Sequence, residues 1–222
     1  MLRPLWRLLL RCRFVLFQRH RLNRMVIEHV AGRSIVVLPH VFNPRLFRTG
    51  QLLSETLNES LIQPRARVLD MGTGTGIGAL LAAQWAPNVD AVDINPEAVR
   101  CARINALLHT MEDRIVVYEG DLFEPVHGRR YDVVLFNPPY FRGRPDDGFE
   151  MAWRSDDVVE RFAAALPDHL TPGGYALVVL SSDGDSATFL AAFRRNDLIL
   201  DVVTRQNLIS EVLTIYRLQR AP

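Results

Sequence analysis

The feature that most limits what this chain can fold into is a short apolar run near residues 66–70 that leads into a glycine-rich turn. The turn holds Gly72, Gly74 and Gly76, and an alanine- and leucine-rich stretch with the composition of a helix follows it. Strand, tight turn and helix in this order open a mononucleotide-binding βαβ unit, because glycines let the backbone approach a ligand closely. A second apolar run ends at Asp93, at the distance from the glycines where an acid is expected to bind ribose hydroxyls.

A second motif, Asn137-Pro138-Pro139-Tyr140, follows the apolar run of residues 131–136. It therefore stands at the carboxyl end of a predicted parallel strand, where open α/β sheets bind ligands. Prolines have no N–H and hold the preceding residue extended, so the segment offers fixed carbonyls and the Asn137 side chain as acceptors. This surface suits a substrate that donates two N–H groups, and Tyr140 adds an aromatic face for a flat group. A proline-stiffened strand exit without a ligand is the alternative explanation.

Apolar runs and helical patterns alternate from residue 66 onward, which predicts an α/β fold. Strands are expected near residues 66–70, 88–93, 114–118, 131–136, 174–181, 198–205 and 211–218. Helices are expected near residues 50–62, 76–86, 95–108, 156–169 and 186–195. Asn95 is expected to cap its helix with Pro96 in the first turn, and residues 171–174 are expected to form a turn.

An acid, Asp70, precedes the first glycine by two residues, where it would repel a pyrophosphate but suits a cofactor that carries an ammonium and a sulfonium. Asp70 and the glycines resemble motif I of the class I S-adenosylmethionine-dependent methyltransferases. The segment from Asn137 to Tyr140 resembles motif IV of those members that methylate planar amide or amino nitrogens. The resemblance extends over roughly residues 43–182 and implies a Rossmann-like, seven-stranded α/β sheet, mostly parallel with an antiparallel last strand.

The resemblance also implies the cofactor, S-adenosylmethionine, and the residues of the site. The residues expected to bind the cofactor are Thr49, Asp70, Gly72, Gly74, Gly76, Asp93, Ile94, Asp121, Leu122 and Asn137. Asp121 stands where the family contacts the adenine amino group. The residues expected to act on the acceptor are Asn137, Pro138 and Tyr140, and no metal site is expected.

Two further segments are similar to one branch of this family, the HemK-type protein-glutamine N5-methyltransferases. Residues 41–53 resemble the segment before motif I, in which a threonine lies over the cofactor; Thr49 matches it, and it is also a candidate N-cap of the next helix. Residues 152–162 resemble an Ala-Trp segment of the eukaryotic and archaeal HemK-like enzymes. Those enzymes methylate the glutamine of a release-factor loop and work with a small zinc-binding partner. The chain departs from that pattern over residues 154–157, where the family has a glycine-rich stretch.

The rest of the sequence predicts one methyltransferase domain over residues 41–222, preceded by a basic amphipathic helix and extension over residues 1–40. Seven arginines fall within the first 24 residues, and Arg3, Arg7 and Arg11 would share one helical face. This helix could dock on the domain, contact RNA or the ribosome, or serve membrane or organelle targeting, of which membrane contact is the least expected. The two cysteines are too few for a disulfide framework, which favours a reducing cytoplasm. The net charge of +1 does not demand an acidic partner.

Three functions remain open from the residues. The first is methylation of a protein glutamine, with a translation factor as substrate and a small activator subunit as a further expected partner. The second is methylation of an exocyclic amine of adenine or guanine in RNA or DNA, with the arginine-rich helix holding phosphates. The third is a binding module that keeps the fold without the chemistry. None of the histidines adjoins a motif, so they are poor candidates for a base: His109, His127 and His169 are expected at the surface or in loops, while His40, beside the segment before motif I, remains open.

Overall fold

The computed structural model describes residues 24–139 and 157–221. Their main feature is a seven-stranded sheet with the order β5-β4-β3-β6-β7-β9-β8. The strands are β3 (Arg67–Met71), β4 (Asn88–Asp93), β5 (Ile115–Glu119), β6 (Tyr131–Phe136), β7 (Leu170–Ser181), β8 (Leu198–Asn207) and β9 (Val212–Arg220). Strands β3 to β7 pair in parallel, whereas β9 is antiparallel to both β7 and β8. The predicted fold class, with an antiparallel last strand, is confirmed.

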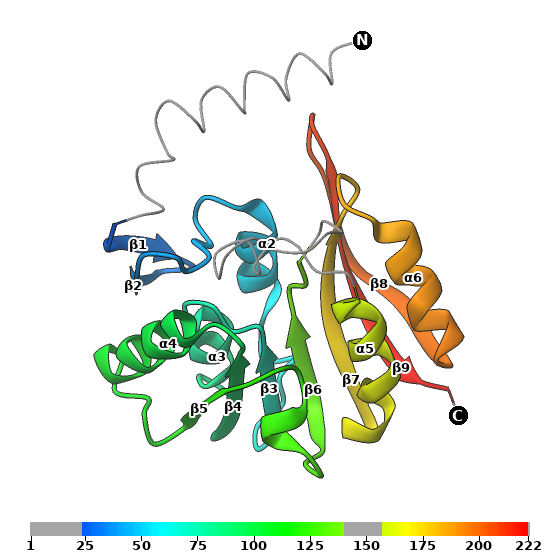
Figure 1. Cartoon of the computed structure of the whole chain (residues 1–222), viewed down its shortest axis with the longest axis horizontal. Helices are drawn as coiled ribbons and strands as arrows, with labels where there is room; N and C mark the ends of the chain where they lie inside the picture. The colour runs from blue at the N-terminus through cyan, green and yellow to red at the C-terminus, as the bar shows by residue number, and fades with distance from the viewer. Residues whose placement is uncertain (1–23, 140–156, 222) are drawn as a thin grey trace.

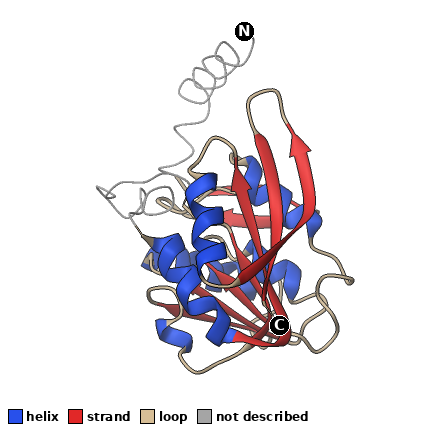
Figure 2. Ribbon diagram, turned by 90° about the vertical axis from the view of Figure 1, so that its right-hand side faces the viewer, coloured by secondary structure: helices blue, strands red, loops and turns tan. Residues whose placement is uncertain are grey.

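Helices cover both faces of this sheet (Figures 1 and 2). On one face, α2 (Arg48–Thr56), α3 (Ile77–Ala82) and α4 (Pro96–Leu108) share a hydrophobic cluster with the strands. On the other face, α5 (Val158–Ala165) and α6 (Ser186–Arg195) belong to a second cluster. Neighbouring strand residues alternate between the two: Val68 belongs to the first cluster and Leu69 to the second, and both are fully buried. A central strand buried on both faces explains why its sequence is continuously apolar.

A hairpin that was not predicted, β1 (Val26–Val30) and β2 (Arg33–Val37), precedes the sheet. Its turn, Ala31-Gly32, has two residues with positive φ, the arrangement that matches the twist of a tight hairpin. Asn105 of α4 ties the hairpin to the domain, because its side chain accepts from Val36 N at 2.8 Å and donates to Val36 O at 2.7 Å and Thr75 O at 2.9 Å.

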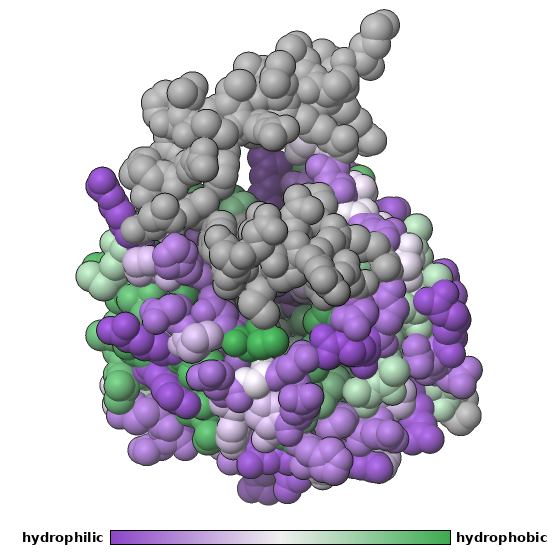
Figure 3. Space-filling model, viewed as in Figure 1, coloured by the Kyte–Doolittle hydropathy of each residue, from purple (hydrophilic) through white to green (hydrophobic). Residues whose placement is uncertain are grey.

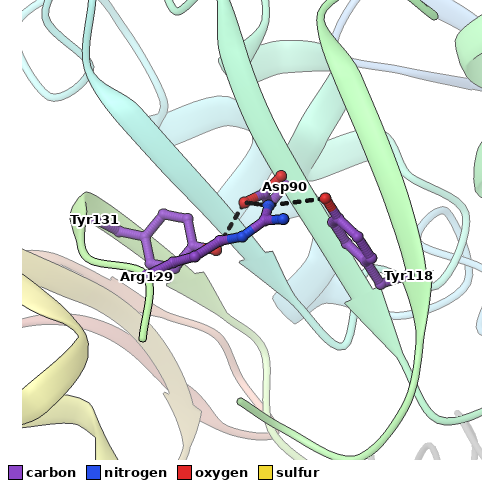
Figure 4. A network of polar contacts seen from close by, with 4 residues as sticks. All are labelled: Asp90, Tyr118, Arg129 and Tyr131. Atoms are coloured by element: carbon purple, nitrogen blue, oxygen red, sulfur yellow. Dashed lines mark hydrogen bonds and ion pairs between the residues drawn. The ribbon is translucent and has the colours of Figure 1, made fainter. Parts of the chain in front are cut away.

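The connection from β5 to β6 contains only the short 3-10 helix η3 (Glu124–Val126), and a polar network braces the nearby strands (Figure 4). Asp90 of β4 accepts from Arg129 Nη1 at 2.8 Å and from the Tyr131 hydroxyl at 2.7 Å. Arg129 Nη1 also donates to the Tyr118 hydroxyl of β5 at 2.7 Å, and the guanidinium lies 5.0 Å from the centre of that ring. The network thus joins β4, β5 and the start of β6 without a covering helix.

Several helices and strands begin or end at other residues than predicted. Strand β7 begins at Leu170, so the expected turn at residues 171–174 lies inside the strand, where the register with β6 shifts. Helix α5 ends at Ala165, and the 3-10 helix η5 (Leu166–His169) follows, because Pro167 cannot continue an α-helical ladder. The predicted N-cap of α4 is confirmed, since Asn95 Oδ1 accepts from Glu97 N at 3.0 Å. The amphipathic helix expected before residue 24 lies outside the described residues.

Candidate functional site

The register of three parallel strands places the predicted motifs side by side. Met71, the last residue of β3, pairs with Val92 of β4 on one side and with Phe136, the last residue of β6, on the other. The residues that follow directly are therefore Gly72, Asp93 and Asn137, at neighbouring positions on the carboxyl edge of the sheet. Three predicted site residues that are far apart in sequence thus meet where open α/β sheets bind ligands.

The glycine-rich turn is held against the end of β4. Thr73 N donates to Val92 O at 3.0 Å, and Gly74 N donates to Asp93 Oδ2 at 2.8 Å. Gly76 has φ +82°, and a Cβ there would lie 3.0 Å from two atoms of Ala102 in α4, so only glycine fits. The turn is a fixed backbone surface at the start of α3, as the sequence predicted.

Asp93 is half-buried and holds two loops at once. Besides the contact from Gly74, its Oδ1 accepts from Asn95 N at 3.0 Å. Burial raises the pKa of this carboxyl, and the backbone donors of Asn95, Gly74 and Ile94 oppose the rise. Each carboxylate oxygen can accept a further hydrogen bond, so the group remains able to receive ribose hydroxyls.

Asp70 lies deeper than the sequence interpretation placed it. Its Oδ2 accepts from Thr73 Oγ1 at 2.6 Å and from Ala79 N at 2.9 Å, so the carboxyl fixes the turn and the first turn of α3 from below. Burial raises its pKa to about 7, against the lowering effect of these two hydrogen bonds. A Cβ at Gly78 would lie 2.6 Å from Asp70 Oδ1, so the buried carboxyl requires a glycine there, a constraint that the sequence analysis did not identify. The pattern of four alternating glycines from residue 72 to residue 78 was its signal.

The segment before β3 lies over the glycine turn. Asn95 Nδ2 donates to His40 O at 2.9 Å, and a Cβ at Gly74 would lie 3.9 Å from Phe42 Cβ. Thr49 follows in the first turn of α2, but Phe47 occupies the N-cap position, so the expected N-cap role of Thr49 is wrong. The Thr49 side chain is buried, and its Oγ1 has no hydrogen-bond partner among the described residues.

The expected adenine contact, Asp121, is already paired. Its Oδ2 accepts from Arg161 Nη1 of α5 at 2.5 Å, and Arg161 also contacts Asp157 Oδ1 at 3.1 Å. Leu122 follows with φ +47° and is half-buried, and Ile94 is 43% exposed. These residues lie beyond the ends of β4 and β5, which pair residue for residue up to Asp93 and Glu119.

The acceptor motif leaves β6 directly beside the glycine turn. Asn137 and Pro139 are half-buried and Pro138 is buried, while the expected stacking residue Tyr140 lies outside the described residues. Phe136 supports the motif from the second core cluster. The centre of its ring lies 4.3 Å from the centre of the Phe162 ring, and a Cβ at Gly72 would lie 3.8 Å from Phe136 Cε2. The start of the motif therefore stands on a packed aromatic base.

The histidines give one correction. His169, expected at the surface, is buried, stacks on Phe123 at 4.2 Å between ring centres, and bonds Ala165 O through Nδ1. His109 bonds the backbone of the β1–β2 hairpin at Ser34 O. In the described ranges, no group of three or more histidine, cysteine or acidic side chains could hold a metal ion. No helix there is long and apolar enough to cross a bilayer.

Relatives of known name agree on the kind of chemistry. The chain is 33% identical to a putative protein N5-glutamine methyltransferase of Methanocaldococcus jannaschii, over 71% of this chain and 80% of that protein. It is 40% identical to a ribosomal protein uL3 glutamine methyltransferase of Bradyrhizobium diazoefficiens, over 49% of this chain and 38% of that protein. A tRNA adenine-N6 methyltransferase of Porphyromonas gingivalis is 32% identical, over 57% of this chain and 54% of that protein. The chain thus spans well under two thirds of two of these three relatives.

Solved structures share the fold at low sequence identity. A 16S rRNA guanine-N2 methyltransferase of T. thermophilus, solved with S-adenosylmethionine and guanosine, superposes with a TM-score of 0.69 and 19% identity, over 89% of this chain and 50% of that one. A two-protein complex of E. cuniculi, described as methylating a translation termination factor, contains a chain that superposes with a TM-score of 0.61 and 20% identity, over 82% of this chain and 99% of that one. The model of the methyltransferase small domain matches residues 33–201. The chain therefore belongs to the methyltransferase small domain family and has the class I methyltransferase fold.

Proposed function

We propose that this chain transfers a methyl group from S-adenosylmethionine to the side-chain amide nitrogen of a glutamine in a protein. The observation that carries the proposal is the register that sets Gly72, Asp93 and Asn137 side by side. A ligand held on the turn and on Asp93 would have its reactive end next to Asn137 and Pro138.

The residues present fit the cofactor. Thr49 has a buried hydroxyl without a partner in the described part of the chain, next to the segment that covers the turn. Asp93 offers its remaining lone pairs to ribose hydroxyls, and Asp121 keeps an oxygen, Oδ1, beyond the one that Arg161 contacts. When bound, S-adenosylmethionine supplies a methyl group on a positively charged sulfur, which the nearby acids favour.

Asn137 and Pro138 would position the acceptor. The Asn137 side-chain oxygen and the Pro138 carbonyl accept the two N–H bonds of the planar NH2 group, which directs the nitrogen lone pair toward the methyl carbon. Holding these atoms about 3–3.5 Å apart and in line accounts for most of the acceleration, since positioning alone can lower a barrier by several kcal/mol. The C–N bond would form as the methyl C–S bond breaks with its electron pair left on sulfur, and the nitrogen would lose one proton to water, so no strong base is required.

The acceptor class can be tested directly. We would incubate the full chain with methyl-labelled cofactor and a cell extract, with and without ribonuclease, and map the label by mass spectrometry. Label that survives ribonuclease and maps to glutamine is expected. Label that disappears with the RNA would contradict a protein acceptor.

A nucleic acid acceptor is the second candidate, favoured by the tRNA adenine-N6 methyltransferase among the relatives. Adenine and glutamine present the same planar NH2 group to Asn137 and Pro138. RNA binding should weaken steeply with salt, because binding releases counterions from the phosphates. Activity that is flat between 50 and 200 mM salt, roughly the range over which such binding collapses, would exclude this candidate.

We also propose that a small partner subunit binds this chain. Strand β5 is an edge of the sheet, and Val116, Leu107 and Leu108 beside it are 49%, 61% and 61% exposed. The corresponding margin of the face in Figure 3 carries hydrophobic residues. An unpaired edge next to apolar surface suits strand addition by a small protein, and Val116→Asp should abolish co-purification of such a subunit.

A further inference from the structure

We propose that a pocket at the amino-terminal edge of the sheet, opposite the methyl-transfer site, binds a small oxyanion such as a phosphate or carboxylate compound. The pocket has a volume of about 420 Å³. It lies between the loop before β3, the start of β6, the start of β7 and the end of β9. Since β3 has five residues and a strand rises about 3.3 Å per residue, the pocket is roughly 15 Å or more from the glycine turn. Its ligand cannot reach the transferred methyl group, and the inference does not depend on the proposed function.

Arg217 is the residue on which the proposal rests. Its guanidinium lies 4.4 Å from the centre of the Tyr175 ring, and its Nε is buried without a hydrogen-bond partner. Asp201 stands opposite Arg217 in the β8–β9 register, yet the two form no ion pair, and none of the described residues gives Arg217 one. A permanently charged group that is partly withdrawn from water without an anionic partner costs stability unless a ligand supplies the counter-charge.

Tyr175 holds the guanidinium in place. Its hydroxyl donates to Leu61 O in the loop before β3, so the ring is fixed at both ends, by this bond and by its strand. A fixed aromatic face restricts the arginine fork, which lowers the entropy lost when the fork binds a carboxylate or phosphate.

The remaining charges in the pocket leave it positive. Asp132 is the one acidic side chain among its lining residues, and both of its oxygens are engaged, Oδ2 by Arg67 N at 2.8 Å and Oδ1 by Thr171 Oγ1 at 2.7 Å. Arg65 adds a second cation, whereas Gly173, with φ +79°, leaves open space around its Cα. Two arginines against one carboxylate that already accepts two hydrogen bonds favour an anion, and the limited volume favours a small one.

Thermal unfolding of the full chain tests the proposal, with inorganic phosphate and citrate as probes at constant ionic strength. The wild-type Tm should rise by a few degrees at about ten times the Kd, the size expected for a ligand that binds only the folded state. Arg217→Gln should lose the rise and weaken phosphate binding at least tenfold by calorimetry. Arg220→Gln is the matched control, because it removes the same charge from the same strand but, three residues further along, lies on the opposite face of the sheet.

Three results would overturn the proposal. An equal rise in Arg217→Gln and Arg220→Gln would show a general salt effect. No rise in the wild type, with a flat calorimetric titration, would exclude the small anions. A single-stranded RNA that binds in an Arg217-dependent manner while phosphate and citrate do not would assign the arginine to a phosphodiester backbone.

If Arg217→Gln does not fold, Arg65→Gln replaces it and should weaken phosphate binding several-fold. An unchanged affinity in that variant would count against the pocket.

Discussion

At the carboxyl edge of the sheet the candidate site has two acids at its surface, Asp93 and Asp121, and a third, Asp70, beneath the glycine turn, whereas the pocket at the amino edge is lined by two arginines. The difference follows the direction of the helices. Helices that cross back from strand to strand begin at the carboxyl edge and end at the amino edge, so the first edge collects positive helix ends and the second collects negative ones. Charges that complement these ends also select ligands of opposite sign.

Individual contacts show both halves of this rule. Asp70 accepts from Ala79 N in the first turn of α3, while Arg114 Nη1 donates to Ala83 O at the other end of the same helix, at 3.0 Å. The acids at the carboxyl edge favour a cationic cofactor, and the two arginines of the pocket at the amino edge favour an anion. Substitutions at the two edges should therefore separate the two ligands.

The largest effect is expected at Asn137. Asn137→Ala removes the side-chain acceptor, and it should lower kcat by roughly 10²-fold or more, a loss of about 3 kcal/mol. The affinity for cofactor should change far less, measured by calorimetry. Arg195→Gln, an exposed charge at the end of α6, serves as a control that should keep its turnover. Wild-type turnover in Asn137→Ala at saturating substrates would remove the motif from the mechanism.

A second effect is expected in the pH dependence of stability, through Asp70. Because burial raises its pKa from 3.8 to about 7, the folded state holds a proton that the unfolded state releases above pH 4. The free energy of unfolding should therefore fall as the pH rises from about 4 to 7, by at most about 4 kcal/mol, and level off above 7. Urea unfolding across this range checks the slope. Asp70→Asn should flatten it, and an unchanged slope in that variant would assign it to other groups.

Asp93→Ala tests whether Asp93 binds the cofactor rather than the acceptor. It removes the expected ribose contact and the anchor of Gly74 N, so cofactor affinity should drop about tenfold to thirtyfold, or about 1.4–2 kcal/mol. The acceptor KM should stay close to that of the wild type, because Asn137 and Pro138 are unchanged. An effect on the acceptor KM alone would reverse the roles given to the two residues.

The smallest effect is expected at Thr49. Thr49→Val keeps the shape of the side chain and removes the hydroxyl, so the cofactor should bind about threefold to fivefold more weakly, which corresponds to less than 1 kcal/mol. The protein without cofactor should be equally or more stable, since a buried hydroxyl without a partner disappears. Lower stability of the unliganded protein with unchanged affinity would make the hydroxyl a structural group.

The parts of the fold and site that could be predicted are those that a short run of sequence specifies. The strands near the site were predicted to within a residue or two, because each is a continuous apolar run that ends in a turn. The site residues at the strand ends followed from the same runs. The depth of Asp70 could not be predicted, since its contacts with Thr73 and Ala79 depend on the three-dimensional path of the turn.

The N-terminal hairpin has a local sequence signal. Residues 26–30 and 33–37 contain β-branched residues around Ala31-Gly32, a pattern typical of two strands and a tight turn. The arginine-rich residues before them drew the interpretation toward a helical extension. The ion pair of Asp121 with Arg161 had no local signal, because it joins residues forty positions apart.

The hydrogen bonds of Asn105 link the hairpin to the glycine turn, and this has a consequence for local unfolding. Its Nδ2 donates to both Val36 O and Thr75 O, so one side chain of α4 is held by the hairpin and the turn together and is freer when either leaves. Any ligand that orders the turn should then slow the hydrogen exchange of the Val36 amide, which donates to Asn105 Oδ1. The rate at which one backbone proton is replaced by deuterium would thus report occupancy of a site to which that proton does not belong.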